Sequence, residues 1–214
     1  MNAGLSNLTS LKAQLLAASL RGDTDYDAVI AAIGLGVAAQ FDAFCNRGFA
    51  RVTGQQDVFR ADRRHWWLNR YPVEAITATE KKDSEADGYL SFPLPPNGSA
   101  LIQSMDLSTG YIMFIALQGY YFSMIRVTYT GGFFFEQLEP QDGGFPTPIP
   151  ATAAPLPNDV QLAFLLQCQN VWKRFDKLGA QIAQDPERQS AIASLELADA
   201  VKELLRPYVR HQIS

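Results

Sequence analysis

The sequence predicts an α+β fold, in which helices from both ends of the chain form a bundle and an antiparallel β subdomain is inserted between them. Near both ends, apolar residues recur every three or four positions, which is the period of a helix. In the middle the period changes to two, as in a strand. We expect one domain of 214 residues, with helical residues 1–51, a β subdomain at 52–135, a proline-rich strap at 136–157 and C-terminal helices at 158–214.

Two helices are expected at the N-terminal end. The first runs from about Leu8 to Leu20, after a cap at Ser6 or Asn7, and Gly22 ends it. Polar residues at 23–25 can then cap a second, longer helix. Its apolar face must meet other helices, and this face consists of Tyr26, Val29, Ile30, Ile33, Val37, Phe41 and Phe44.

The second helix is also rich in small residues, which would let a neighbouring backbone approach closely. Gly34 and Gly36 each cost about 1 kcal/mol relative to Ala in a helix, so close packing is the expected compensation. The pair is not a nucleotide-binding loop, because the third glycine and the preceding strand of that motif are missing.

Six strands are predicted in the β subdomain. Turn signals containing Gly or Pro separate them, and the intervals are too short for crossover helices, so the strands should be antiparallel. In the last strand the apolar set Tyr121, Ser123, Ile125, Val127 and Tyr129 is expected to face inward. The candidate strands are Gln56–Arg60, Trp66–Asn69, Val73–Glu80, Leu101–Asp106, Ile112–Leu117 and Tyr121–Thr130.

The strap holds six of the 12 prolines between Pro140 and Pro157, which forbids a helix and favours an extended connector. Asn158 or Asp159 can cap the helix that follows. Asp185-Pro186 is a further helix start. The last apolar stripe is formed by Ile192, Leu195, Ala198, Val201, Leu205 and Tyr208.

Charge argues against nucleic-acid binding through phosphates. The formal net charge is −4, and the acidic excess lies in residues 81–157, which hold three basic and seven acidic side chains. No basic stripe is present. The longest apolar runs, Ala28–Ala39 and Tyr111–Leu117, are shorter than the ~20 residues of a membrane-spanning helix, so we expect a soluble, unexported protein.

Catalytic, cofactor and metal motifs are missing from the sequence. His65 and His211 are the only histidines, neither lies in a motif, and no Gly-x-Ser-x-Gly turn accompanies them. With Cys45 and Cys168 they do not form a credible zinc site, and we expect both cysteines to be buried apolar residues. The sequence predicts no enzyme, no catalytic residue and no cofactor.

Clustered aromatic residues are the strongest candidates for contacts with other molecules. Three consecutive Phe after Gly131-Gly132 cannot all face one core from a regular strand, so the rings either fold back over the sheet or enter a neighbouring subunit. Neighbouring Trp residues pose the same choice, because adjacent strand positions face opposite sides. The candidate subunit or partner contacts are Trp66, Trp67, Phe133, Phe134, Phe135 and Tyr208.

Four segments spread in order over most of the chain carry a family resemblance. They are the helix end Phe44-Cys45-Asn46-Arg47, the turn Leu68-Asn69-Arg70-Tyr71-Pro72-Val73-Glu74-Ala75-Ile76, the strand end Val127-Thr128-Tyr129-Thr130-Gly131-Gly132-Phe133 and the helix opening Pro157-Asn158-Asp159-Val160. Together they resemble the head-tail connector (adaptor, or head completion) proteins of tailed bacteriophages. Residues 81–120, the strap and the long C-terminal helix depart from the family pattern, so contacts made by these parts do not transfer.

The resemblance implies a structural virion protein of the phage neck, assembled in the host cytoplasm. Such proteins form a ring, commonly of twelve copies, that joins the portal protein of the head to a tail-side stopper or tail-completion protein. DNA would pass through the central channel without specific binding, and no membrane is involved. The acidic excess in residues 81–157 would suit the lining of that channel, although such charges more often belong to loops that simply face water.

Two alternatives remain at this stage. One is another ring-forming neck or tail component, such as a stopper or tail-completion protein, although such proteins tend toward a mostly β core. The other is a small-ligand-binding or enzymatic domain with a pocket between bundle and sheet.

Overall fold

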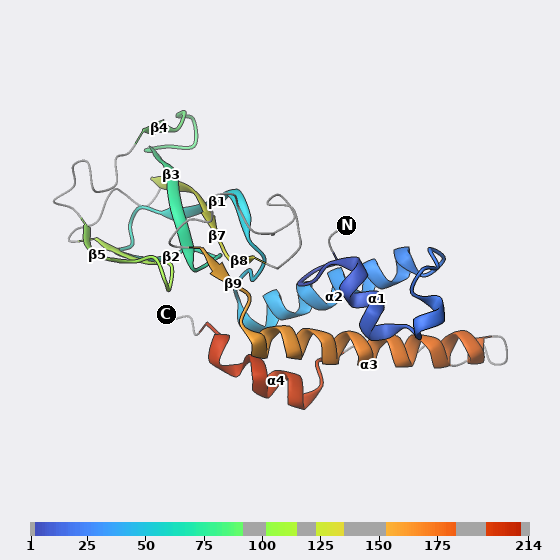
Figure 1. The fold of residues 1–214 in the computed structure, drawn as a ribbon. Helices are drawn as coiled ribbons and strands as arrows, with labels where there is room; N and C mark the ends of the chain where they lie inside the picture. The colour runs from blue at the N-terminus through green and yellow to red at the C-terminus, as the bar shows by residue number, and fades with distance from the viewer. Residues whose placement is uncertain (1–2, 92–101, 115–122, 135–152, 183–195, 211–214) are drawn as a thin grey trace. The chain divides into compact units, whose positions relative to one another are not determined.

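The computed structural model describes residues 3–91, 102–114, 123–134, 153–182 and 196–210, without the side chains of 102, 103 and 175–182. The chain forms two compact units (Figure 1). The helical unit comprises residues 1–47 and 156–214, and the β unit comprises residues 48–155. The predicted α+β fold is confirmed, since helices from both ends of the chain share one unit and antiparallel sheets lie between them in sequence.

The helical unit is built on two antiparallel helices that lie side by side. These are α2 (Asp27–Cys45) and α3 (Asn158–Ile182). Phe41 of α2 meets Phe164 edge-on with ring centroids 6.1 Å apart, and Tyr26 meets Trp172 in the same way at 5.9 Å. Because Tyr26 pairs with the later α3 residue and Phe41 with the earlier one, the two helices run in opposite directions.

Short helices complete this unit. They are α1 (Leu8–Leu15), the 3-10 turns η1 (Ala18–Leu20) and η4 (Arg206–Tyr208), and α4 (Asp199–Leu205). The Asn7 side chain caps α1 by accepting from the backbone N–H of Ser10 at 2.7 Å, as the sequence suggested. The helix predicted up to Leu20 ends earlier, because Leu16 is buried in an extended conformation. The predicted helix start at Asp185-Pro186 lies outside the described residues.

Gly34 has a packing role inside the helical unit. A Cβ built at Gly34 would lie 2.2 Å from the carbonyl oxygen of Ala3, so only glycine lets the N-terminal segment lie this close to α2. Gly36 differs, because a Cβ there would meet no described heavy atom within 4 Å. Packing within the chain therefore explains the first glycine of the pair and leaves the second without a described neighbour.

Both cysteines are buried in the helical unit, and burial raises the pKa of each thiol from its ordinary 9.0 to about 12. At pH 8 we expect their thiolate fractions to be about 1,000-fold below that of a free thiol, and alkylation to be correspondingly slow. Above about pH 9 the unfolded chain ionises first, so the free energy of unfolding should fall as pH rises toward 12. Maleimide labelling of native and urea-unfolded protein measures the expected difference in alkylation rate. Rapid labelling of the native protein would contradict it.

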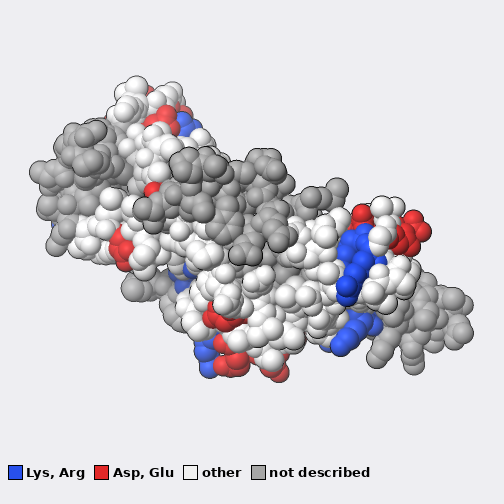
Figure 2. All heavy atoms as spheres, in the orientation of Figure 1, with Lys and Arg blue, Asp and Glu red and all other residues white. Residues whose placement is uncertain are grey.

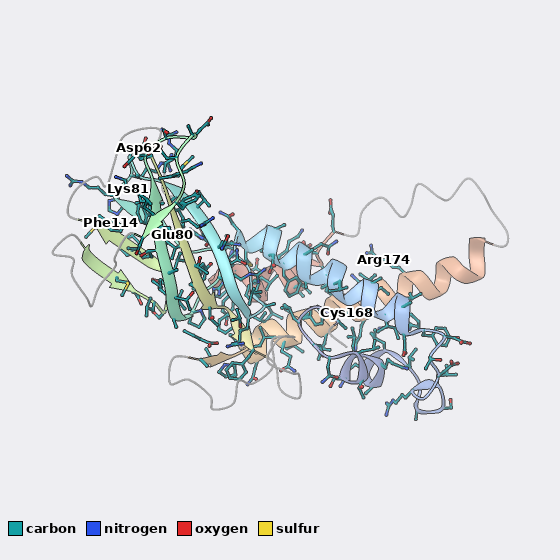
Figure 3. All side chains as sticks on the ribbon, turned by 90° about the horizontal axis from the view of Figure 1, so that it is seen from above. Asp62, Glu80, Lys81, Phe114, Cys168 and Arg174 are labelled. Carbon is teal, nitrogen blue, oxygen red and sulfur yellow. The ribbon has the colours of Figure 1, made fainter. Side chains whose placement is uncertain are left out.

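The β unit contains a four-stranded sheet in the order β1-β7-β3-β4 and a three-stranded sheet in the order β2-β6-β5. The pairings within both sheets are antiparallel, as predicted. The strands are β1 (Val52–Arg60), β2 (His65–Trp67), β3 (Val73–Lys82), β4 (Leu90–Ser91), β5 (Ile102–Asp106), β6 (Tyr111–Phe114) and β7 (Met124–Gly131). Glu80 and Lys81 lie toward the end of β3, in the part of the unit where Figure 3 also labels Asp62.

One strand pair in the β unit is parallel, and neither of its strands is among the six that the sequence predicts. The end of the strap forms β9 (Ala154–Pro155), which pairs with β8 (Phe133–Phe134). The sequence analysis ended the last strand at Thr130, and it missed a strand that returns at the end of the strap. Extended backbone at Ala154 and Pro155 does agree with the extended connector expected there.

The core of the β unit lies between its two larger sheets. Alternate residues of β7, including Ile125, Val127 and Tyr129, are fully buried, which confirms the predicted inward face where it is described. Trp66 and Ile112 contribute from the smaller sheet. The whole cluster consists of Ala61, Trp66, Leu68, Val73, Ile112, Phe114, Ile125, Val127 and Tyr129.

The buried hydroxyl of Tyr129 holds the turn that follows β2. It donates to Asp57 Oδ2 at 2.7 Å and accepts the backbone N–H of Arg70 at 2.9 Å. Asp57 Oδ2 also accepts the N–H of Asn69 at 2.6 Å. Burial and the Asp57 carboxylate both raise the pKa of Tyr129, so the phenol stays protonated and can donate.

Replacing Tyr129 with Phe should lower the free energy of unfolding by about 1–2 kcal/mol, because a partly buried backbone N–H and a carboxylate each lose a partner. Urea denaturation measures the change. Tyr111→Phe is the matched control, since that hydroxyl contacts the exposed His65 ring and should matter less. Equal stability of Tyr129→Phe and the parent protein would contradict the proposed anchoring role.

Candidate interaction surfaces

The outer face of α2 carries an open apolar groove of about 480 Å³. Three small residues, Ala28, Ala32 and Gly36, recur every four positions along it, and Val171 of α3 forms one wall. We call this the α2 groove, and its lining residues are Ala28, Val29, Ala32, Ile33, Gly36, Val37, Gln40 and Val171. The groove is an apolar surface large enough to receive side chains from another helix.

An apolar ridge follows the outer face of α3. Leu162 and Leu166 are 51% and 40% exposed and lie one helical turn apart, so together they present an apolar surface. Gln169 and Lys173 continue the same line at i+7 and i+11. We call these four residues the α3 ridge. Leu162 and Val171 are nine positions apart, so the ridge lies on the side of α3 opposite to the wall of the α2 groove.

Opposite charges stand at the ends of these two surfaces. Asp25 is exposed just before α2, and its described contact is a hydrogen bond from its own N–H to Asp23 Oδ1 at 2.9 Å. Lys173 is exposed at the end of the α3 ridge. Asp27, by contrast, forms an ion pair with Lys12 of α1. In Figure 2 the charged side chains of the helical unit gather near the α1–α2 end and over α4, with uncharged surface between these groups.

Aromatic rings gather on one face of the smaller sheet in the β unit. Trp67 packs against Tyr111 with ring centroids 5.0 Å apart, and both rings also face His65. His65 Nδ1 lies 2.7 Å from the Tyr111 hydroxyl. His65 is exposed, and the other two are partly exposed. This aromatic face is a further candidate contact surface. Its rings also shelter Trp67 within the chain.

Three of the candidate contact residues are buried within the β unit. Trp66 is 1% exposed, Phe134 is 2% exposed and Phe133 is 9% exposed. Phe133 stacks on Phe49 at 6.4 Å, which matches the alternative in which the rings fold back within the chain. Phe135 lies outside the described residues. The role of these residues in subunit contacts therefore stays a prediction, and their described packing does not require a second subunit.

The glycines before Phe133 let the end of β7 lie against the chain that enters β1. Gly132 has φ +98°, and a Cβ there would lie 2.5 Å from the Ala50 carbonyl oxygen. The Phe133 N–H donates to the Phe49 carbonyl and its carbonyl accepts from the Arg51 N–H, both at 2.7 Å. The Thr130-Gly131-Gly132-Phe133 segment is thus explained by close backbone packing.

Tyr208 is partly exposed near the C-terminal end of the helical unit. Its hydroxyl donates to the Asp159 carboxylate, with distances of 2.8 and 2.9 Å to the two oxygens. Burial and that carboxylate raise the pKa of Tyr208 to about 12. Next to it, the Arg210 N–H donates to the Cys45 carbonyl at 2.9 Å. These bonds tie the chain after α4 to the start of α3 and the end of α2.

Catalytic chemistry finds no support in the described part of the chain. No group of three or more His, Cys, Asp or Glu residues there could hold a metal ion. The two cysteine thiols are buried with raised pKa values, and His65 contacts aromatic rings. His211 lies outside the described residues. The described surfaces are suited to binding through apolar contact.

The α2 helix is long and apolar enough to cross a membrane by length and composition, with a mean hydropathy of 1.8. The sequence prediction counted only the run to Ala39, whereas the helix continues to Cys45. Core helices of soluble proteins pass the same test. What distinguishes α2 is that only 33% of its most apolar 18-residue stretch is buried. Much of its apolar face therefore has no cover among the described residues.

Sequence patterns alone missed the α2 groove and the α3 ridge. Helical periodicity identified Val29, Ile33 and Phe44 as core, yet the first two are partly exposed and Phe44 is 37% exposed. Both α2 faces are apolar, so the pattern could not tell the covered face from the open one. The available signal was Gly36, a helix glycine that no described neighbour requires.

No protein-family model matches the chain, and no curated protein matches it either. Solved structures that match the fold include two from gene transfer agent particles. A chain from the neck of an empty gene transfer agent particle, computed with C6 symmetry, superposes with a TM-score of 0.58. A chain from the virion of a native gene transfer agent particle superposes with a TM-score of 0.55.

Both matches have 13% sequence identity and cover 100% of this chain and 94% of the other. At this identity they establish a shared fold. Because coverage is nearly complete on both sides, the likeness includes the helical unit, the β unit and the connection between them in sequence.

Proposed function

We propose that the protein is a structural, non-enzymatic component of the neck of a phage-like virion, where copies of it form a ring. The observation that carries this is the fold shared over nearly the whole of both chains with a protein from a particle neck. Exposed apolar surfaces support it, because a ring subunit must cover part of its surface with the next copy.

Within the neck, we propose the adaptor position, between the portal protein and a tail-side stopper or tail-completion protein, with twelve copies in the ring. The family resemblance of four sequence segments supports this position. The structure accounts for two of them physically, since the Leu68–Ile76 segment is held by Tyr129 and the Val127–Phe133 segment packs on Phe49 and Ala50. The same segments thus shape the β unit.

The ring would let DNA pass without binding it tightly. Four of the acidic residues assigned to the channel lining are described, namely Asp83, Glu85, Asp87 and Asp106. Hydrogen bonds from Lys81 and Ser123 lower the pKa of Asp83, and those from Ser108 and Thr109 lower that of Asp106, so both stay ionised at neutral pH. A cryo-EM map that places these acids on the outer rim would contradict the lining role.

Negative-stain electron microscopy of the purified protein, alone and mixed with the portal protein of the same phage or prophage, tests the proposal. We expect annular particles, or a complex that forms only when portal is present. A protein that stays monomeric with portal and joins only a tail-side component would shift the assignment to a stopper. A protein that joins no neck component would overturn it.

A further inference from the structure

We propose that the α3 ridge of one copy docks into the α2 groove of the next copy, so that each α2 packs between two α3 helices. The inference rests on the proposed ring and assigns the two surfaces that close it. Three observations carry it: an open groove, an exposed ridge with the same spacing, and opposite charges at matching positions along both.

The groove is shaped for a helix. Its small residues Ala28, Ala32 and Gly36 are spaced by four, and the exposed leucines of the α3 ridge are also spaced by four. Rows of residues at i±4 are the ridges that pack into grooves between neighbouring helices. Gly36 fits this packing, because its helix cost is not offset by any described neighbour, whereas a second helix could approach it closely.

Charges fix the direction of the docked helix. Lys173 lies seven residues after Leu166, roughly 10 Å along α3, and Asp25 lies seven residues before Ala32, just before α2 begins. If the docked α3 runs antiparallel to α2, Leu166 meets Ala32, Leu162 meets Gly36 and Lys173 meets Asp25. A parallel arrangement would place Lys173 at the other end of the groove.

The same antiparallel arrangement already exists inside one copy. There, Tyr26 pairs with Trp172 and Phe41 with Phe164. The proposed contact repeats this antiparallel direction on the groove side of α2, where Val171 of the copy's own α3 forms one wall. Since the ridge and the groove wall at Val171 lie on opposite sides of α3, the contact joins different surfaces of two copies, which generates a ring or a filament and not a twofold dimer.

Cross-linking tests the contact directly. We would prepare full-length Ala32→Cys and Leu166→Cys proteins with tags of different size and treat them with a short bis-maleimide, with portal protein added if rings need it. The native Cys45 and Cys168 are buried, so they contribute little background. We expect cross-links between the two variants when mixed, and at least roughly tenfold fewer in either variant alone, because the two interacting surfaces are different.

Substitutions test the energetic roles. Leu166→Asp should weaken association by roughly 100-fold, since it places a charge in an apolar contact. Gly36→Met should block the groove while the unfolding temperature of the single chain stays equal or rises, because Met favours helix. Leu35→Asp is the matched control, as Leu35 is 52% exposed on α2 but does not line the groove. Its association should be unchanged.

Charge exchange tests the register. Asp25→Lys or Lys173→Glu alone should weaken association by about threefold to fivefold, and the two together in one chain should restore it. Restoration requires that these two positions face each other across the contact.

Each outcome decides the inference. Rings that form without Ala32→Cys to Leu166→Cys cross-links would overturn it and leave the proposed function standing. Cross-links within Ala32→Cys alone would show a twofold contact and overturn it as well. Binding of the groove to phosphatidylglycerol vesicles, without cross-links, would assign α2 to a membrane instead. If neither rings nor cross-links form, both the inference and the proposed function fail.

Discussion

Glu74→Ala is expected to lower the free energy of unfolding of the β unit by about 3–5 kcal/mol, the largest effect of any single charge in the described structure. Glu74 and Arg51 form a paired contact, with Nε to Oε1 at 2.5 Å and Nη2 to Oε2 at 3.0 Å. Their side chains are only 3% and 7% exposed. Removing one partner leaves the other charge buried with its main counter-charge lost.

The pair joins the chain before β1 to the start of β3. The backbone N–H of Arg51 donates to the Phe133 carbonyl. Loss of the Arg51–Glu74 pair should therefore also loosen the strand end that carries Phe133. Urea denaturation followed by fluorescence measures the effect. A Trp172→Phe background leaves Trp66 and Trp67 as the only tryptophans, so that the signal reports the β unit.

Two controls separate charge burial from strand effects. Glu80→Ala removes a partly exposed ion pair on the same strand, in which Arg126 Nε lies 2.8 Å from Glu80 Oε2, and should destabilise the β unit far less than Glu74→Ala. The double replacement Arg51→Met with Glu74→Leu should recover most of the loss, because an apolar pair needs no counter-charge. Equal effects of Glu74→Ala and Glu80→Ala would contradict the explanation.

The parts of the fold that sequence predicted well have strong local causes. Strand β7 alternates from Met124 to Tyr129, and its buried set matches the inward face assigned to Ile125, Val127 and Tyr129. The cap at Asn7 is also local, because its side chain reaches only three residues ahead. In both cases the pattern that allows the prediction lies within a short stretch of the chain.

The parts that sequence missed depend on distant residues. The first helix ends before Gly22 because Leu16 is buried in an extended conformation, which no local signal marks. The β8–β9 pair joins residues that are about 20 positions apart across the strap. Likewise, α2 is apolar on two faces, and only the placement of α3 determines which face remains open as the groove.

Trp66 and Trp67 are the clearest case of this limit, because period-two alternation predicts that they face opposite sides but not which side is the core. The structure places Trp66 in the core, with its ring 5.5 Å from Phe59 and 4.3 Å from Phe114 by centroids. Trp67 lies on the aromatic face with His65 and Tyr111. The two neighbours should therefore respond differently to the same substitution.

Trp66→Ala is expected to lower the free energy of unfolding by about 3–5 kcal/mol, because it empties the centre of the β-unit core. Trp67→Ala should cost less than about 1 kcal/mol, since surface substitutions have small effects, and it should instead weaken association if the aromatic face meets a partner. Circular dichroism during urea denaturation measures stability in both variants, and sedimentation with the portal protein measures association.

Trp66→Phe distinguishes loss of volume from loss of a hydrogen bond. The Trp66 indole nitrogen is buried and has no hydrogen-bond partner among the described residues, so the smaller aromatic ring loses packing but breaks no described bond. We expect this variant to retain most of the stability that Trp66→Ala loses. If Trp66→Phe were as destabilised as Trp66→Ala, the indole N–H would be bonded. If Trp67→Ala were the more destabilised of the two alanine variants, the assignment of core and surface would be reversed.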